Sequence, residues 1–195
     1  YLHENGCPWD RDACSAAVVN GHLSVLQYLH ENGCPCDSDT CSAAARNGNL
    51  PVLKYLHESG CPWDRGTCCV AAGNGHLPVL KYSHENGCPW DSDTCSSAAA
   101  DGHLPVLQYL HENGCRWDSG TCWSAAVRKH WDCLQYAVDN KCPGWEIYAY
   151  KYASTSDEYK LHSRFKQAPL GDETARNENV ILRPSKPPRS TPPPS

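Results

Sequence analysis

The sequence repeats with a period of 27 residues, and this period constrains the fold more than any other feature. A unit of this length cannot bury an apolar face of its own, so neighbouring units must stack on one another. The pattern therefore predicts a solenoid with five copies of the unit and a decaying sixth. The recurring positions include Tyr1, Tyr28, Tyr55, Tyr82, Tyr109 and Tyr136, and Cys7, Cys34, Cys61, Cys88, Cys115 and Cys142.

Each unit is predicted to form two short helices joined by a tight turn, as residues 38–60 illustrate. Side-chain oxygens of Asp39 and Thr40 are expected to cap the first helix by accepting hydrogen bonds from free backbone N–H groups. Gly48 and Gly60 end the two helices, because glycine adopts the left-handed conformation of a helix C-terminus without a Cβ clash. The apolar faces consist of Cys41, Ala44 and Ala45, and of Leu50, Val52, Leu53 and Leu56.

The segment GHLSVLQYLHENGCPCD at residues 21–37, with the Ala-Ala pair before Asn-Gly in the type unit, resembles the ankyrin repeat. The resemblance covers roughly residues 1–142 and implies an all-α solenoid whose inner helices line a concave groove for a partner protein. Ankyrin units are about 33 residues long, and the shortening here falls where that family builds a β-hairpin finger, so a plain turn is expected. The leucine-rich repeat has a similar length, but its Leu-x-x-Leu-x-Leu strand is missing.

The repeat array is expected to occupy residues 1–152, with a degenerate final copy as its cap. In that copy Lys129 replaces a glycine, and residues 143–152 are predicted to form the last helix. Residues 153–195 form a tail that is polar and Pro-rich from about residue 167, and such a composition is expected to be disordered. Because methionine is absent and the first unit lacks its inner helix, we expect a fragment of a longer protein.

Cysteine and histidine recur through the copies, in the order shown by His3, Cys7, Cys14 and His22. Structural zinc sites usually have cysteine pairs two to four residues apart; these spacings are longer, so no metal and no other cofactor is expected. The resemblance puts Cys7 at a buried ankyrin alanine, which implies that nearly all 14 cysteines are reduced packing residues. A disulfide between Cys7 and Cys14 is the alternative, and it belongs to a secreted, disulfide-stapled or metal-loaded repeat protein.

The repeated histidines and aspartates also favour a structural role. His57 and its counterparts can bond a loop aspartate or lie against tryptophan, and a shared pH response is the less favoured alternative. The resemblance makes Trp63 a buried residue. Asp10 and its repeats lie one unit apart along a rod, so they cannot converge on one substrate as an acid/base pair, and we expect them to cap the loops. No phosphate loop or nucleophile elbow is present, and the protein is predicted not to be an enzyme.

Differences between the copies show which positions the fold does not dictate. Two of these positions lie four residues apart on the first helix of each unit, opposite its Cys/Ala face. The resemblance puts this stripe in the partner-binding groove, and neutral drift at exposed positions is the alternative. Trp123 is either a binding anchor or a cover for the end of the core. The candidate partner-binding residues are Arg46, Arg65, Ser42, Trp123, Ser96 and Ala100.

Charge narrows the class of partner. The formal net charge of the chain is −5, and residues 1–145 carry 16 acidic against 9 basic side chains. An acidic array repels a phosphate backbone, so a protein with a basic face is expected as the partner and nucleic acid is not. No apolar run is long enough to span a membrane. We expect a monomer, in an intracellular (cytoplasmic) compartment if the cysteines are reduced.

These observations predict a non-catalytic scaffold for protein–protein interaction. In the tail, Pro184, Pro187 and Arg189 match the Pro-x-x-Pro-x-basic pattern that SH3 domains bind. The rival class is the secreted or metal-loaded Cys-rich repeat protein, and a third hypothesis is a decayed array with no maintained partner.

Overall fold

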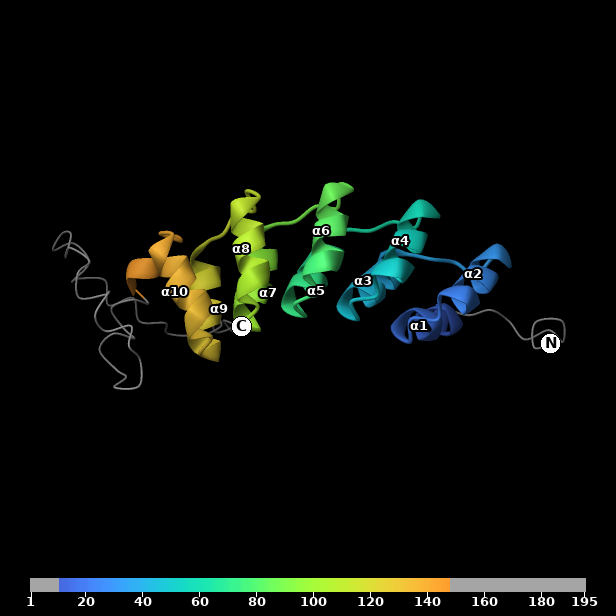
Figure 1. Ribbon diagram of the computed structural model, residues 1–195, viewed down its shortest axis with the longest axis horizontal. Coiled ribbons are helices and arrows are strands. Elements are labelled where there is room, and N and C mark those ends of the chain that lie inside the picture. Colours follow the sequence, from blue (N-terminus) through green and yellow to red (C-terminus); the bar gives the residue numbers. More distant parts are fainter. Residues whose placement is uncertain (1–10, 148–195) are drawn as a thin grey trace, which may run out of the picture.

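The computed structural model describes residues 11–147, and within that range the chain forms ten complete α-helices, the start of a further helix at residues 145–147, and no strand. The helices form five pairs that stand side by side in one row, which makes an elongated solenoid (Figure 1). The predicted all-α solenoid is therefore confirmed. The helices are α1 (Arg11–Val19), α2 (Leu23–Glu31), α3 (Ser38–Arg46), α4 (Leu50–Glu58), α5 (Arg65–Gly73), α6 (Leu77–Glu85), α7 (Ser92–Ala100), α8 (Leu104–Glu112), α9 (Ser119–Arg128) and α10 (Trp131–Asp139).

The odd-numbered helices make the inner row, and consecutive members of this row pack closely on one another. Their contacting faces carry only short side chains, and in α3 the residues Cys41, Ala44 and Ala45 are fully buried. Short side chains let two helix backbones approach closely, so the inner row is denser than the outer row of even-numbered helices. In α4 the predicted apolar stripe is confirmed, with Leu50 half-buried and Val52, Leu53 and Leu56 fully buried.

An aspartate caps each of the inner helices α3, α5, α7 and α9. Asp37, in extended backbone, accepts a hydrogen bond from the Thr40 N–H at 3.0 Å, and Thr40 Oγ1 accepts one from the Asp37 N–H at 3.3 Å. Two of the free donors at the start of α3 are thus satisfied reciprocally. The capping role expected for Asp10 and its repeats is confirmed at Asp37, whereas the expectation that Asp39 caps α3 is wrong, because Asp39 lies inside the first turn and is exposed.

The glycine after each of the inner helices α1, α3, α5 and α7 has two roles. Gly75 has φ +76°, and a Cβ at this position would lie 2.7 Å from ring atoms of His103 in the next unit. The same stacking of a histidine on a glycine occurs at Gly48, where the Nε2–H of His76 also donates to the Arg46 carbonyl at 2.9 Å. Glycine is therefore needed both for the left-handed backbone and for the close approach of the next repeat.

The final inner helix ends without such a glycine. Lys129 adopts φ 64°, the left-handed conformation that glycine adopts in the earlier copies. A non-glycine residue in this conformation costs about 1 to 2 kcal/mol. The last copy thus keeps the backbone geometry of the repeat although its sequence has diverged.

The loops after α4, α6 and α8 are each held by an aromatic cluster that joins two repeats. The imidazole of His57 stacks on Trp63 with ring centroids 3.9 Å apart, and its Nδ1 is hydrogen-bonded to the Tyr82 hydroxyl at 3.1 Å. His84 and His111 stack in the same way on the tryptophans of their own loops. The histidines therefore lie against tryptophan, as one of the two alternatives predicted. The expectation that Trp63 is buried is wrong, because it is half-buried under the His57 ring.

Several expectations concern residues beyond the described range. Residues 143–144 form a turn and residues 145–147 are helical, so the last helix, predicted at 143–152, begins two residues later than expected. Residues 148–152 of that prediction lie outside the described residues. The same holds for the tail at 153–195, including Pro184, Pro187 and Arg189, so the boundary of the array stays a prediction. Within residues 11–147 no helix is long and apolar enough to cross a membrane.

The glycine–histidine contact leads to a stability prediction. We expect Gly75→Ala to lower the free energy of unfolding by about 2 to 4 kcal/mol, because it combines a strained backbone with overpacking against His103. Gly60→Ala is the matched control: Gly60 has φ +80° but nothing within 4 Å of the added Cβ, so it should lose only about 1 to 2 kcal/mol. Urea denaturation measures both, and equal losses would show that the contact with His103 contributes nothing.

Candidate functional site

The stripe predicted on the inner helices divides into two kinds of position in the structure. Ser42 is half-buried, and its hydroxyl lies 3.4 Å from the Thr67 hydroxyl of the next inner helix. Cys69, its counterpart one unit on, lies 3.1 Å from the Ser97 hydroxyl. The first position of the stripe therefore belongs largely to the contact between repeats. The second position is open at Arg46, which is exposed at the end of α3.

Ser96 and Ala100 are the corresponding pair on α7, and both are half-buried. The contrast between a packed first position and an exposed second position is therefore weaker on this helix. A Cβ added at Gly120, in the first turn of α9, would lie 3.2 Å from the Ser96 hydroxyl. Ser96 thus faces the following inner helix as Ser42 does. The structure therefore leaves only part of the predicted stripe accessible to a partner.

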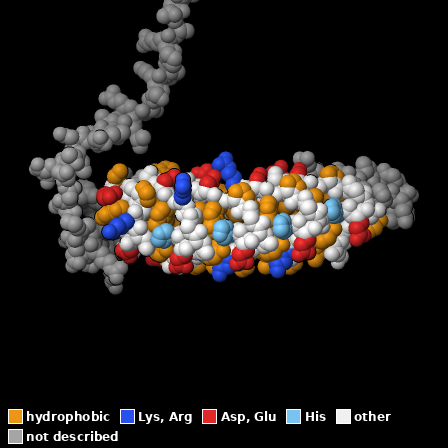
Figure 2. Space-filling view, turned by 90° about the horizontal axis from the view of Figure 1, so that it is seen from above, with side chains coloured by type: hydrophobic (Ala, Val, Ile, Leu, Met, Phe, Trp, Pro, Cys, Tyr) orange, Lys and Arg blue, Asp and Glu red, His pale blue; other side chains and the backbone are white. Residues whose placement is uncertain are grey.

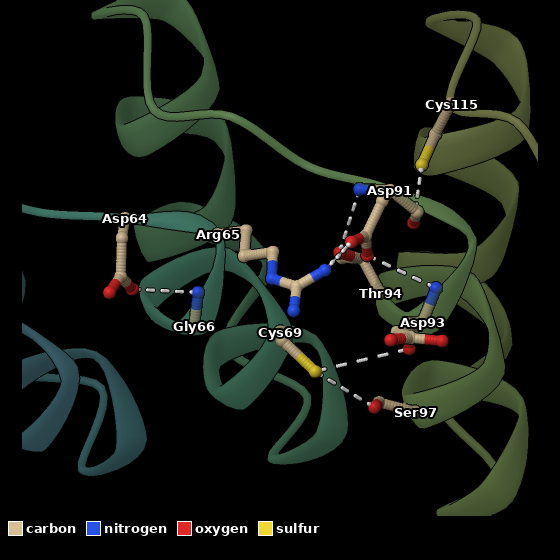
Figure 3. A network of polar contacts seen from close by, with 9 residues as sticks. All are labelled: Asp64, Arg65, Gly66, Cys69, Asp91, Asp93, Thr94, Ser97 and Cys115. Atoms are coloured by element: carbon tan, nitrogen blue, oxygen red, sulfur yellow. Dashed lines mark hydrogen bonds and ion pairs between the residues drawn. The ribbon is translucent and has the colours of Figure 1, made fainter.

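Arg65 takes part in a polar network that links two repeats (Figure 3). Its Nη1 donates to Asp91 Oδ2 at 2.9 Å, while Asp91 caps α7 by accepting from the Asp93 N–H at 3.1 Å. The Arg65 side chain nevertheless stays 71% exposed. A surface ion pair of this kind contributes little to stability, so Arg65 remains available for a partner.

An exposed apolar pair lies on the last inner helix. Trp123 is 53% exposed and Val127 is 51% exposed, and because they are four residues apart on α9 they share one face. Both side chains are therefore accessible from solvent, and the role of Trp123 as a binding anchor stays a prediction.

The cysteines after the outer helices have a packing role that includes a hydrogen bond. Cys115 is buried, and its thiol donates to the Asp91 carbonyl at 3.2 Å (Figure 3). Cys88 and Cys142 make the same bond to Asp64 and Asp118, at 3.1 and 3.2 Å. Each of these thiols fixes a loop against the loop of the preceding repeat. The predicted packing role of the repeated cysteines is confirmed at these three positions.

The surroundings of Cys41 and Cys68 on the inner helices keep these two thiols protonated. Burial, helped by the charges of Cys88, Asp37 and Asp64, raises the pKa of the Cys41 thiol to about 12. A hydrogen bond with Cys88 and burial raise the pKa of the Cys68 thiol still further. Because the thiolate is the reactive form of cysteine, these buried groups are poor nucleophiles at neutral pH.

Two disulfides contradict the expectation that the repeated cysteines are reduced. Cys14 is bonded to Cys34, and Cys36 is bonded to Cys61. The expectation that nearly all cysteines are free is wrong for these four, and the alternative pairing of Cys14 with Cys7 is wrong because Cys14 pairs with Cys34. The remaining cysteines of the described residues are free.

The disulfide at Cys36 identifies a residue that the sequence interpretation missed. Cys36 does not belong to the cysteines that recur every 27 residues. A signal was present, since the loop sequence is CPCD here and CPWD in the other complete copies except one, which is CRWD. Cys36 takes the place of the tryptophan and lies beside His30 and Cys61, with the ligand atoms of all three within 4.8 Å of one another.

The fold defines a class of protein, the helical-repeat solenoid, and comparison with solved structures narrows it. The human ASB11 ankyrin repeat domain is similar to this chain, with a TM-score of 0.56 and 16% sequence identity over 66% of this chain and 69% of that one. The helix pairs described above are of the ankyrin type, and the chain has the ankyrin-repeat fold. This fold commonly mediates protein–protein interaction. No protein-family model matches the sequence, and no match to a curated protein was found.

The raised pKa values predict which thiols react in the folded protein. A thiol with a pKa of about 12 has roughly a thousandth of the thiolate of an ordinary cysteine at neutral pH. We therefore expect iodoacetamide to label the half-buried Cys69 and to leave Cys41 unlabelled until the protein unfolds. Mass spectrometry of peptides from native and urea-unfolded samples measures this. Equal labelling rates for Cys41 and Cys69 in the native sample would contradict the prediction.

Proposed function

We propose that the array is a non-catalytic scaffold that binds a partner protein along its inner-helix surface, with Trp123 as the main anchor. The observation that carries the proposal is the exposed pair of Trp123 and Val127 on α9. Tryptophan and arginine dominate the binding energy of most interfaces, and a few such residues account for most of the affinity. An apolar pair of this size on an inner helix of an ankyrin-type solenoid fits that role.

The charge distribution supports a partner with basic side chains near its apolar contact. Asp39 and Asp93 are exposed in the first turns of α3 and α7, and Asp101 is exposed directly after α7. Figure 2 shows acidic side chains on both sides of a row of histidines, with several Lys and Arg side chains among them. Complementary charge of this kind raises the association rate and selects the partner more than it raises affinity.

Arg46 and Arg65 are the two basic contacts in the proposal, and they need different substitutions. Arg46 is exposed, so Arg46→Glu reverses its charge without disturbing a described hydrogen bond of its side chain. Arg65 is paired with Asp91, and a glutamate there would repel the cap of α7. Arg65→Gln is the cleaner variant, because it removes the charge and creates no like-charge contact.

The proposal predicts a loss of affinity without a loss of stability. A partner recovered by affinity capture with the full chain, and then purified, should bind Trp123→Ala about 30-fold more weakly, which corresponds to about 2 kcal/mol. The melting temperature should move by less than about 2 °C, because the side chain is already half solvated. Isothermal titration and thermal unfolding monitored by circular dichroism give the two quantities.

Val25→Ala is the matched control for this experiment. Val25 is also 50% exposed, but it lies on the outer helix α2, so its truncation should leave the affinity unchanged. A combined Arg46→Glu, Arg65→Gln and Trp123→Ala variant that folds and still binds with full affinity would rule out the inner-helix surface. Binding would then have to be sought elsewhere in the chain.

A further inference from the structure

The second loop differs from the others at the residue that faces its histidine. In the later loops a tryptophan covers the imidazole, as Trp63 covers His57. In the loop after α2 this residue is Cys36, so His30 is without that stacking partner and has a sulfur atom near it instead. The exchange replaces an apolar cover with a metal-ligating side chain at a single point of the array.

Three ligating side chains converge at this point. The ligand atoms of His30, Cys36 and Cys61 lie within 4.8 Å of one another, and the Cα atoms of the two cysteines are 5.7 Å apart. His30 Nδ1 is hydrogen-bonded to the Tyr55 hydroxyl at 3.0 Å, which fixes the orientation of the ring. Metal-bound histidines usually have such a second partner, which holds the ring in position.

We propose that His30, Cys36 and Cys61 form a zinc site when the disulfide between the two cysteines is reduced. Zn²⁺ accepts thiolate and imidazole ligands at about 2.3 and 2.0 to 2.1 Å. Tetrahedral geometry then separates two bound sulfurs by about 3.7 Å, and sulfur from nitrogen by about 3.6 Å. The two sulfurs move apart once their bond is reduced, and a histidine nitrogen already lies within 4.8 Å of both. Three protein ligands leave the fourth position to water.

The disulfide between Cys36 and Cys61 is the oxidised form of the same site. Reduction adds two electrons and two protons to the sulfur–sulfur bond and releases two thiols, and Zn²⁺ then displaces the two thiol protons. A phosphine supplies the electrons in the test: it takes up the oxygen of one water molecule, while the two hydrogens of that water go to the sulfurs. The oxidised site cannot bind zinc in this way, since each sulfur is already bonded to the other.

The other repeats lack the full ligand set. Cys88 is the counterpart of Cys61, but its thiol donates to the Asp64 carbonyl, and Trp63 takes the place of the second cysteine. One repeat further on, the Cys115 thiol donates to the Asp91 carbonyl, and Trp90 takes the place of the second cysteine. The proposal therefore assigns zinc to one loop of the described array, and the remaining repeats serve as internal controls.

The test is zinc titration of the full chain. Metal-free protein, reduced with the phosphine and kept anaerobic, is titrated with Zn²⁺ against a chromophoric chelator. We expect one tight equivalent, with thiolate-to-metal absorption when Co²⁺ replaces Zn²⁺. Cys36→Trp restores the residue of the other loops, so it should fold normally and lose this equivalent. Tyr55→Phe should keep the ligands but weaken zinc binding about 10-fold.

A gain of binding in the next repeat completes the test. Trp63→Cys gives that loop the same ligand spacing, with His57 and Cys88, and it should add a second equivalent of Zn²⁺. Zinc binding by the oxidised protein, or an unchanged equivalent in the Cys36→Trp variant, would overturn the assignment. So would a reduced wild type without zinc, or a folded Trp63→Cys variant without the second equivalent.

Discussion

Close packing between inner helices is the constraint on which the rest of the structure depends. The odd-numbered helices pack closely because each one presents cysteine and alanine to its neighbours. In α3 the residues Cys41, Ala44 and Ala45 are fully buried. Larger side chains at these positions would force the repeats apart. The contact of His103 on Gly75 then sets the spacing at the end of the helices. This spacing determines where the loops and the surface residues lie.

The same packing explains why most cysteines of the array are structural. A thiol is small enough for the interface between repeats, and burial there raises its pKa, so that it stays protonated and unreactive. A cysteine can take part in metal chemistry only where a copy departs from the repeat pattern. Cys36 is such a departure, because it puts a second sulfur beside Cys61 and a histidine at the half-buried edge of the loop.

The proposed binding surface follows the same rule as the proposed zinc site. Positions shared by all copies are used to hold the repeats together, so specificity must come from residues that differ between copies. Trp123 differs from the serines and the cysteine at the same position in the other units, and it is exposed rather than packed. A near-uniform solenoid thus presents a few distinct residues on a regular frame, which is how repeat proteins form extended binding surfaces.

The 27-residue period was sufficient to predict the two-helix unit, the solenoid, the buried Cys/Ala face and the glycines that end the helices. These features depend on local propensity and on the need of each unit to bury its apolar face against an identical neighbour. Other features required the tertiary structure, because they depend on atoms one repeat away. The half-burial of Ser42 by Thr67 and the hydrogen bond of His57 to Tyr82 became visible only there. The meeting of His30, Cys36 and Cys61 is of the same kind, since only the stacking of repeats brings Cys61 to a loop 25 residues earlier in the chain.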